Sequence, residues 1–388
     1  MFDLDLTQPE PIPAAGIDEA VSLMQSGRLF RYNGDAAVRL EVAFAELTGS
    51  KHALAVNSGG SSIFLSLIAA GVQPGDTVLL GGFTLAPVPG AIVHAGARPI
   101  LVDVTEDLVI DTDDLRAKAD QARFFLLSHM RGHISNMAEI MAIAAEFDLI
   151  VIEDCAHTLG ATWDGKASGT FGIAGCYSLQ TYKHLNCGEG GVLVTDDADL
   201  AARAIIHSGS YMHYQHHQAR PPLEVFERWR AITPNYSMRL TNLAAALALP
   251  QIPLLAERAE RMNRAYNHLA TRLRSLAGVR VPKRDPREAF IGSSIQFFPT
   301  ASRSQLQEFT QRCADAGLPL GWFGRERMEG FTSRPAQWDY LQERELPETE
   351  DILANLMDLR IPPAMTIDHC DAAVDIINTA LTAVRERP

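Results

Sequence analysis

Residues 149–161, LIVIEDCAHTLGA, carry the pattern that decides the fold. The segment begins as an apolar run of strand length and ends in the acidic pair Glu153 and Asp154. Comparable runs come earlier in the chain, at HALAV (52–56), TVLLGG (77–82), RPILVDV (98–104) and ARFFLLSH (122–129). Segments with helical spacing of apolar residues separate them. Continuous Val, Ile and Leu strands that alternate with helices predict an α/β fold, with a mainly parallel central sheet covered by helices on both faces.

The regions on either side of this pattern predict two further parts. The first 30 residues are proline-rich and weakly periodic, so we expect an N-terminal arm (1–30) ahead of a large domain (31–250). A long helical pattern over 239–276 crosses Pro250, where we place the change of domain. Beyond it, the strand-like SSIQFFPT (293–300) and the helical segments 304–317 and 371–386 predict a smaller C-terminal α/β domain (251–388).

The composition excludes several classes of protein. The chain has 388 residues and a formal net charge of −13, and it lacks the clusters of Lys and Arg that nucleic-acid binding needs. No apolar run approaches the ~20 residues that span a bilayer, and the acidic N-terminus does not resemble a signal peptide. The five cysteines form no CxxC pair, so we expect reduced thiols in a cytoplasmic protein. His213, His216 and His217 have no carboxylate in register, and we expect no metal site there.

Polar residues that follow the strands are the candidates for chemistry, because ligands of such sheets collect at the carboxyl ends of the strands. Asp154 ends one strand. In residues 175–191, GCYSLQTYKHLNCGEGG, Lys183 lies among neutral residues, five positions after Ser178 and ahead of three glycines. Only 5 of the 34 basic residues are lysines. A partly desolvated lysine has a lowered pKa and can act as a neutral amine nucleophile, as Schiff-base chemistry with pyridoxal phosphate requires.

These motifs, the SGG turn at 58–60 and the helical AAALALPQ (244–251) resemble the DegT/DnrJ/EryC1/StrS aminotransferases. The likeness is strongest over about residues 30–250. It implies a fold-type-I enzyme that uses pyridoxal 5'-phosphate and acts in sugar biosynthesis. The expected reaction moves an amino group from an amino acid, Glu or Gln, to a keto-sugar or related carbonyl. The likeness also implies a homodimer with the active site at the subunit interface.

The resemblance assigns roles residue by residue. Lys183 matches the lysine that forms the aldimine and moves the proton, Asp154 matches the partner of the pyridine nitrogen, and His157 stands beside the ring. The remaining cofactor contacts implied in this way are Gly59, Gly60 and Ser61 at the phosphate, Ser178 also at the phosphate, Phe83 as the stacking aromatic in place of Leu85, and Asn235 reaching across the dimer near Ser237. Gly60 replaces the usual Thr. His129 matches a strand-end histidine of the family, and Phe30, Arg31, Tyr32 and the segment 207–222 are expected to line the acceptor pocket.

Three alternative functions stay open, and the sequence argues against them to different degrees. A nicotinamide-dependent dehydrogenase would need G-x-G-x-x-G after the first strand, and NSGGSS (57–62) lacks that spacing. A regulator that binds pyridoxal phosphate without turnover would keep the same residues. Another reaction of this cofactor, such as elimination, epimerisation or C–C bond formation, is also compatible with Lys183. The sugar dehydratases of the family carry histidine at that position, so the lysine favours transamination.

Overall fold

The computed structural model describes residues 2–386, and within them the larger part is built on a seven-stranded sheet with the order β1-β9-β8-β5-β4-β2-β3. Its strands are β1 (His52–Val56), β2 (Thr77–Gly81), β3 (Arg98–Val102), β4 (Phe124–Ser128), β5 (Ile150–Asp154), β8 (Ala174–Ser178) and β9 (Gly191–Thr195). The pairs from β3 to β8 are parallel. Strand β9 is antiparallel to both of its neighbours. The predicted mainly parallel sheet is therefore confirmed.

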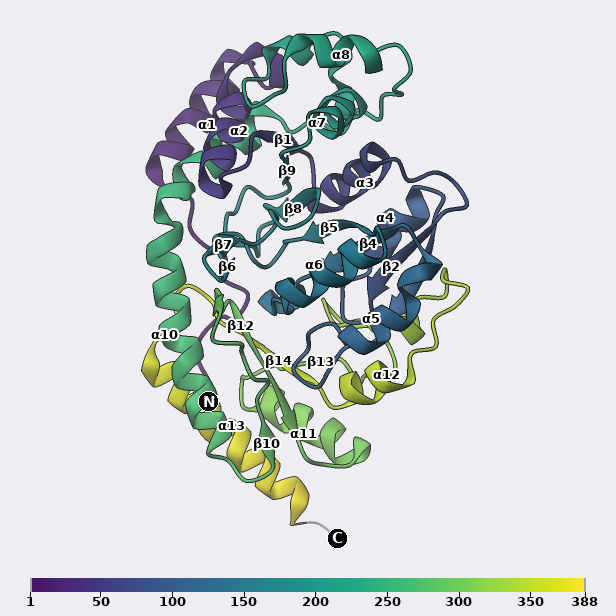
Figure 1. The fold of residues 1–388 in the computed structure, drawn as a ribbon. Helices are drawn as coiled ribbons and strands as arrows, with labels where there is room; N and C mark the ends of the chain where they lie inside the picture. The colour runs from purple at the N-terminus through teal and green to yellow at the C-terminus, as the bar shows by residue number, and fades with distance from the viewer. Residues whose placement is uncertain (1, 387–388) are drawn as a thin grey trace.

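Helices cover both faces of this sheet, as Figure 1 shows. One face packs on α3 (Gly59–Ala70), α4 (Pro87–His94) and α7 (Ala198–Ile205). The other packs on α2 (Ala36–Thr48), α5 (Thr112–Lys118), α6 (Met137–Glu146) and α9 (Asn242–Ala248). A sheet buried on both faces explains why its strands are apolar throughout rather than alternating.

Side chains along β5 point alternately to the two faces of the central sheet. Ile152 belongs to the core under α3, whereas Val151 belongs to the core under α6. Because successive side chains point to opposite faces, Asp154 follows Ile152 toward α3 and Glu153 follows Val151 toward α6. The two adjacent carboxylates of this strand therefore lie on opposite faces of the sheet, in different surroundings.

The long helix expected over 239–276 is interrupted. The chain forms α9, then a 3-10 segment (Leu249–Leu254), and only then α10 (Leu255–Arg274). Pro250 and Pro253 lie inside the interruption, because proline lacks the backbone N–H of an α-helix and clashes with the preceding turn. Helix α10 then runs from the larger part of the molecule to the smaller one, where it lies beside α13 (Figure 1).

The smaller part is an antiparallel sheet backed by helices. The sheet has the order β10-β12-β14-β13, with β10 (Val279–Arg280), β12 (Ser294–Pro299), β13 (Gly321–Trp322) and β14 (Met357–Arg360). Its core includes residues of α10, α11 (Arg303–Asp315) and α13 (Ile367–Arg385). Further elements are α8 (Leu223–Trp229) and α12 (Pro347–Ala354). A separate sheet is formed by three short strands, β6 (Thr162–Trp163), β7 (Lys166–Ala167) and β11 (Glu288–Ala289).

The N-terminal segment connects the two parts. Phe2 and Leu6 are buried in the core of the smaller part, whereas α1 (Ala14–Ser26) packs against α9 of the larger part. Between them, the buried Glu10 pairs with Arg258 and Arg261 of α10. The weak periodicity of this segment did not indicate helix α1. The domain limits 1–30, 31–250 and 251–388 stay a prediction.

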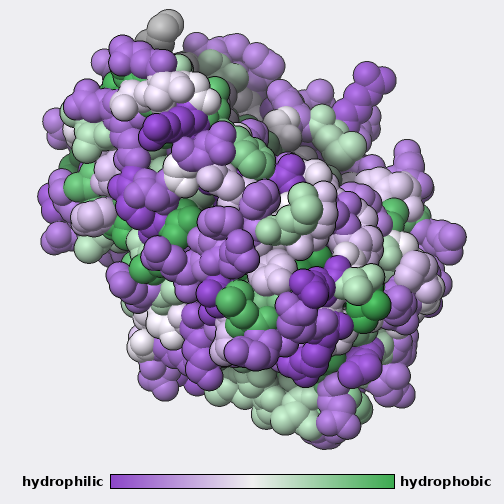
Figure 2. Space-filling view, turned by 90° about the horizontal axis from the view of Figure 1, so that it is seen from above, coloured by the Kyte–Doolittle hydropathy of each residue, from purple (hydrophilic) through white to green (hydrophobic). Residues whose placement is uncertain are grey.

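Hydrophilic residues predominate on the face seen from above in Figure 2, with hydrophobic residues in separate small patches. None of the helices formed by residues 2–386 is long and apolar enough to cross a membrane.

Candidate active site

Three polar side chains meet at the carboxyl edge of the sheet, on the face that packs against α3. Ser128 ends β4 and Asp154 ends β5, and the two residues are partners in the parallel register. Asp154 is also the register partner of Cys176 on β8, two residues before Ser178. All three side chains are buried. The sheet register therefore brings together residues that lie far apart in the sequence.

Helix α3 begins directly beside these strand ends. The Ser58 hydroxyl accepts a hydrogen bond from the Ser61 N–H at 3.0 Å and caps the helix. A Cβ on Gly59 would lie 2.8 Å from the Ser178 Cβ, so glycine is required for this close approach. Backbone N–H groups at a helix N-terminus attract anions. The start of α3, with the Ser178 hydroxyl against it, can therefore hold a phosphate.

A chain of hydroxyl groups fixes the Asp154 carboxylate. The Ser128 hydroxyl donates to Asp154 Oδ2 at 2.7 Å, and the Thr84 hydroxyl donates to Ser128 Oγ at 2.9 Å. The Ala156 N–H donates to the other oxygen, Oδ1, at 3.1 Å. Sequence reasoning missed Thr84 and Ser128. The only signal for Ser128 was its place at the end of an apolar strand, as for Asp154.

Lys183 lies within hydrogen-bond distance of His157, with 2.9 Å between Nζ and Nε2. Burial, followed by the positive charge of Arg131, lowers the pKa of Lys183 to about 7, although the negative charge of Asp154 acts in the opposite direction. At neutral pH a large fraction of this amine is therefore unprotonated and nucleophilic. Burial and the adjacent Lys183 also hold the pKa of His157 well below its usual value, so this imidazole is neutral.

Two predicted cofactor contacts are not brought to this group. Phe83 is buried in a cluster with Phe323, against which it packs edge-on at 5.4 Å between ring centroids. That packing does not favour the stacking role, and Leu85 lies against the same cluster. Asn235 lies in an exposed loop, where its side chain accepts from the Ser237 N–H. Among the hydrogen bonds of the described residues, none joins Asn235 to the start of α3 in the same chain.

His129 belongs to the opposite face of the sheet. It lies 3.2 Å from a Glu153 oxygen, and both side chains are fully buried. His129, Glu153 and Cys155 offer ligand atoms within 4.8 Å of one another. The Glu153 oxygens, however, already accept from the N–H groups of Gly169, Phe171 and Gly172. Glu153 therefore holds the 169–172 turn against the sheet, and the cluster is better explained as structure than as a metal site.

Comparison with known proteins agrees with this geometry. Residues 12–378 match the model of the DegT/DnrJ/EryC1/StrS aminotransferase family. The chain belongs to that family. It is 32% identical over 281 residues to the spore coat polysaccharide biosynthesis protein SpsC of Bacillus subtilis, and the aligned region covers 71% of each chain. It is also 32% identical to the GDP-perosamine synthase of Caulobacter vibrioides, over 68% of this chain and 67% of that one.

A solved structure shows the same fold over nearly the whole chain. The aminotransferase TlmJ from Streptoalloteichus hindustanus superimposes with a TM-score of 0.84 at 22% identity, covering 99% of this chain and 100% of that one. As a member of the DegT/DnrJ/EryC1/StrS family, the protein is an aminotransferase that depends on pyridoxal phosphate. The fold is that of the fold-type-I enzymes.

The residues present fit this cofactor. Its three distinctive groups are an anionic phosphate, a basic pyridine nitrogen and an aldehyde. The start of α3 with Ser178 suits the first, the fixed carboxylate of Asp154 suits the second, and the neutral amine of Lys183 suits the third. Ser61 lies at the same helix start, where its N–H donates to Ser58 Oγ and its hydroxyl oxygen accepts from the Ser58 hydroxyl, so its own O–H is the group that it can offer to a phosphate.

The entry segment and the His-rich segment, both expected to line the acceptor pocket, pack on each other in this aminotransferase. The Tyr32 ring stacks on His213 with centroids 4.7 Å apart. Arg31 is almost fully buried and pairs with the buried Glu41, so it does not line a pocket. His217 is buried in the same group and contacts both Glu41 and Tyr32.

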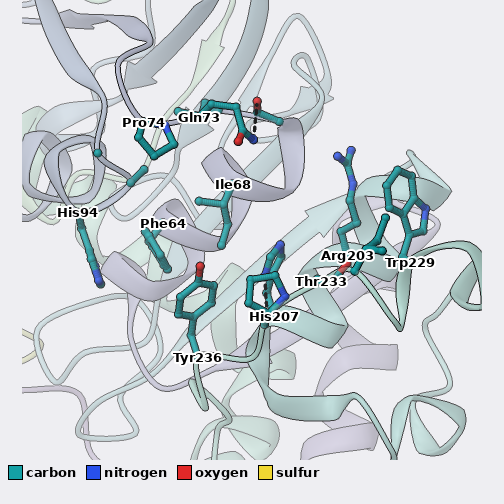
Figure 3. A pocket seen from close by; sticks show the side chains of 16 residues that line it. Phe64, Ile68, Gln73, Pro74, His94, Arg203, His207, Trp229, Thr233 and Tyr236 are labelled. Carbon is teal, nitrogen blue, oxygen red and sulfur yellow. Dashed lines mark hydrogen bonds between the residues drawn. The ribbon is translucent and has the colours of Figure 1, made fainter.

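A cavity of about 470 Å³ lies away from Lys183, between the C-terminal half of α3 and the loop after α8 (Figure 3). Aromatic side chains form much of its wall, among them Phe64, Trp229 and Tyr236. The Arg203 guanidinium stacks on Trp229 at 4.7 Å. None of the residues assigned to the cofactor lines this cavity, although Pro234 and Tyr236, on either side of Asn235, belong to its wall.

Proposed function

We propose that this aminotransferase transfers the amino group of an amino acid, glutamate or glutamine, to a keto-sugar or a related carbonyl compound. The observation that carries the proposal is the Lys183 amine, with its lowered pKa, in the same site as the fixed carboxylate of Asp154 and the start of α3. The sugar class of acceptor is supported by relatives named for polysaccharide biosynthesis and for perosamine synthesis.

The side chains have distinct tasks in this proposal. Bound pyridoxal phosphate supplies an electron sink for the electrons of the Cα–H bond. Lys183 Nζ would be the amine that holds the aldehyde group of the cofactor, and the same amine would move the proton of the donor's Cα. Asp154, held by Ser128 and the Ala156 N–H, keeps the pyridine nitrogen protonated. The neutral His157 hydrogen-bonds Lys183 Nζ and so orients it.

The enzyme is proposed to act as a homodimer. Among the hydrogen bonds of residues 2–386, none joins Asn235 to the phosphate site of its own chain, and the exposed loop that carries it is available to a second subunit. We therefore keep the assignment of Asn235 to the partner's phosphate site, where its amide N–H would donate to a phosphate oxygen.

Absorption spectroscopy of the purified protein tests the function. Wild type loaded with pyridoxal phosphate is expected to show a visible band that Lys183→Ala abolishes, whereas Lys51→Ala, at an exposed lysine, keeps it. Glutamate or glutamine should bleach the band, and a keto-sugar added after removal of the donor should restore it. A band that no amino acid bleaches would contradict transamination and favour a binding protein. Restoration by simple keto acids but by no sugar would contradict the proposed acceptor class.

A further inference from the structure

The cavity beside α3 combines aromatic walls with a single charged side chain. Its volume of about 470 Å³ falls within the roughly 300–1,000 Å³ that is usual for small-molecule sites. In Figure 3, His94 and Phe64 lie at one end of the group of side chains, and Trp229 and Arg203 lie at the other. Arg203 is the only Lys, Arg, Asp or Glu among the described residues that line the cavity. This composition favours an aromatic ligand with one negative charge.

The Arg203 guanidinium is held in place and still has N–H groups to donate. Its Cζ lies 4.7 Å from the centre of the Trp229 ring, and the indole N–H of Trp229 donates to Asp199 Oδ1 at 2.6 Å. Arg203 Nε makes one long hydrogen bond, of 3.4 Å, to the Asp199 carbonyl. Within residues 2–386, neither terminal nitrogen of Arg203 has a hydrogen-bond or ion-pair partner; Asp197 and Asp199 act on its charge from farther away. A guanidinium of this kind binds a carboxylate through two parallel hydrogen bonds.

His207 offers a hydrogen-bond acceptor next to this cation. The two residues are four positions apart along α7 and the π-helical turn that continues it (Ile206–Ser210), so they lie on the same side. His207 Nδ1 lies 2.8 Å from the Pro234 carbonyl, so this nitrogen carries the proton and donates it. Burial lowers the pKa of His207 to about 4, so the ring is neutral and Nε2 keeps its lone pair. A ligand with a ring N–H or O–H can therefore donate to Nε2.

The same histidine holds the loop that carries Asn235. Its Nδ1 donates to the Pro234 carbonyl, and the Tyr236 N–H donates to the His207 carbonyl at 2.7 Å. These two hydrogen bonds flank Asn235, which we assign to the phosphate site of the second subunit. Because Pro234 and Tyr236 also line the cavity, a ligand packed against them would restrain the loop. A restrained loop loses less conformational entropy when Asn235 binds the phosphate.

We propose that the cavity between α3, α7 and the loop after α8 binds a small aromatic carboxylate with a hydrogen-bond donor on its ring, and that this ligand strengthens cofactor binding in the partner subunit. The carboxylate meets Arg203 and the ring donor meets His207 Nε2. A phosphate dianion fits less well, because Arg203 alone would leave one of its charges uncompensated. The effect on the cofactor rests on the proposed function, in which the enzyme is a homodimer and Asn235 reaches the partner's phosphate site.

Calorimetry with indole-3-carboxylate tests the site on the enzyme loaded with pyridoxal phosphate. Loss of a charge-assisted contact in Arg203→Gln should raise the Kd about 30-fold. Ile68→Trp fills the cavity from α3 and should abolish binding. The matched control is Arg228→Gln, at an exposed arginine next to Trp229 that does not line the cavity, and it should leave the Kd unchanged.

Two analogues of the probe separate its polar groups. Indole-3-carboxamide lacks the charge, so it should bind wild type and Arg203→Gln equally weakly. 1-Methylindole-3-carboxylate lacks the ring donor and should bind wild type about fivefold more weakly than the parent acid, the effect of one neutral hydrogen bond. A Kd for indole-3-carboxylate within twofold of wild type in both Arg203→Gln and Ile68→Trp, or no saturable binding to wild type, would overturn the site.

The effect on the cofactor has a reciprocal test, because two ligands that influence each other must do so by the same factor. Saturating indole-3-carboxylate should lower the Kd of pyridoxal phosphate about fivefold, and the cofactor should lower the Kd of indole-3-carboxylate equally. Asn235→Ala should remove both effects and keep the affinity of the cofactor-free enzyme for the probe. A probe Kd that is the same with and without cofactor would overturn the coupling. A visible band that no amino acid bleaches would instead overturn the proposed function, while binding in the cavity would stand.

Discussion

At the scale of single residues, the environment of Lys183 predicts a particular pH dependence. An amine with a pKa of about 7 is protonated at lower pH, and an ammonium does not attack an aldehyde. Uptake of pyridoxal phosphate by the cofactor-free enzyme should therefore slow about tenfold for each pH unit below 7 and level off above it. Arg131→Met removes a charge that lowers this pKa, so the inflection should move to higher pH.

The conservative variant provides the control for that experiment. Arg131→Lys keeps the positive charge and should keep the inflection near that of wild type. The reaction of free pyridoxal phosphate with a model amine, measured over the same pH range, corrects for the cofactor's own titration. An inflection that stays near pH 7 in Arg131→Met would show that the charge of Arg131 does not contribute to the lowered pKa of Lys183.

Single residues also show how far the sequence predicts the site. Asp154 and Lys183 stand out because each follows a strand and differs in kind from its neighbours, so their importance can be inferred without coordinates. Ser128 and Thr84 do not, because a hydroxyl beside a strand is common and its contact with Asp154 depends on the register between β4 and β5. The stacking role of Phe83 stays a prediction, since the sequence could not show that its ring packs edge-on against Phe323.

At the scale of elements, the start of α3 gives a prediction with an internal control. Gly59→Ala would place a Cβ 2.8 Å from that of Ser178 and force the helix away from β8. Overpacking of this kind costs about 1–3 kcal/mol, which here should appear as weaker binding of pyridoxal phosphate. At the next position, Gly60→Ala meets only Ser58 Oγ at 3.8 Å and should bind the cofactor nearly as wild type does.

The measurement that distinguishes the two variants is a comparison of ligands. Pyridoxal phosphate and pyridoxal differ in the phosphate alone, so Gly59→Ala should lose the advantage of the phosphorylated form while Gly60→Ala retains it. Equal losses in both variants would mean that the contact with Ser178 does not govern the effect.

Elements were predicted unevenly, and the reasons are physical. Strands buried on both faces are recognisable from composition alone, so the central sheet followed from the sequence. The break between α9 and α10 was missed because the apolar spacing continues through Pro250 and Pro253, although proline interrupts the backbone hydrogen bonds there. Helix α1 was missed because most of its length lies exposed, which leaves only a weak apolar stripe.

At the scale of the whole molecule, the arrangement of charges complements the proposed substrates locally and not globally. The chain carries a net charge of −13, which repels anionic donors and acceptors at long range. Positive charge lies locally near Lys183, because Arg131, which acts on that lysine, follows β4 and pairs with Asp358 of the smaller part.

The proposed dimer predicts that two inactive variants restore each other. Lys183→Ala removes the reacting amine of its own site, whereas Asn235→Asp should disable the phosphate site of the partner by charge repulsion while its Oδ1 still accepts from the Ser237 N–H. In a mixed dimer, one site then combines the intact lysine of one chain with the intact loop of the other. After unfolding and refolding of an equal mixture, about a quarter of wild-type activity should return, because half of the dimers are mixed and each has one good site.

Separately refolded variants are the control and should stay inactive. A mixture as inactive as its components, from protein that light scattering shows to be dimeric, would mean that Asn235 acts within its own subunit.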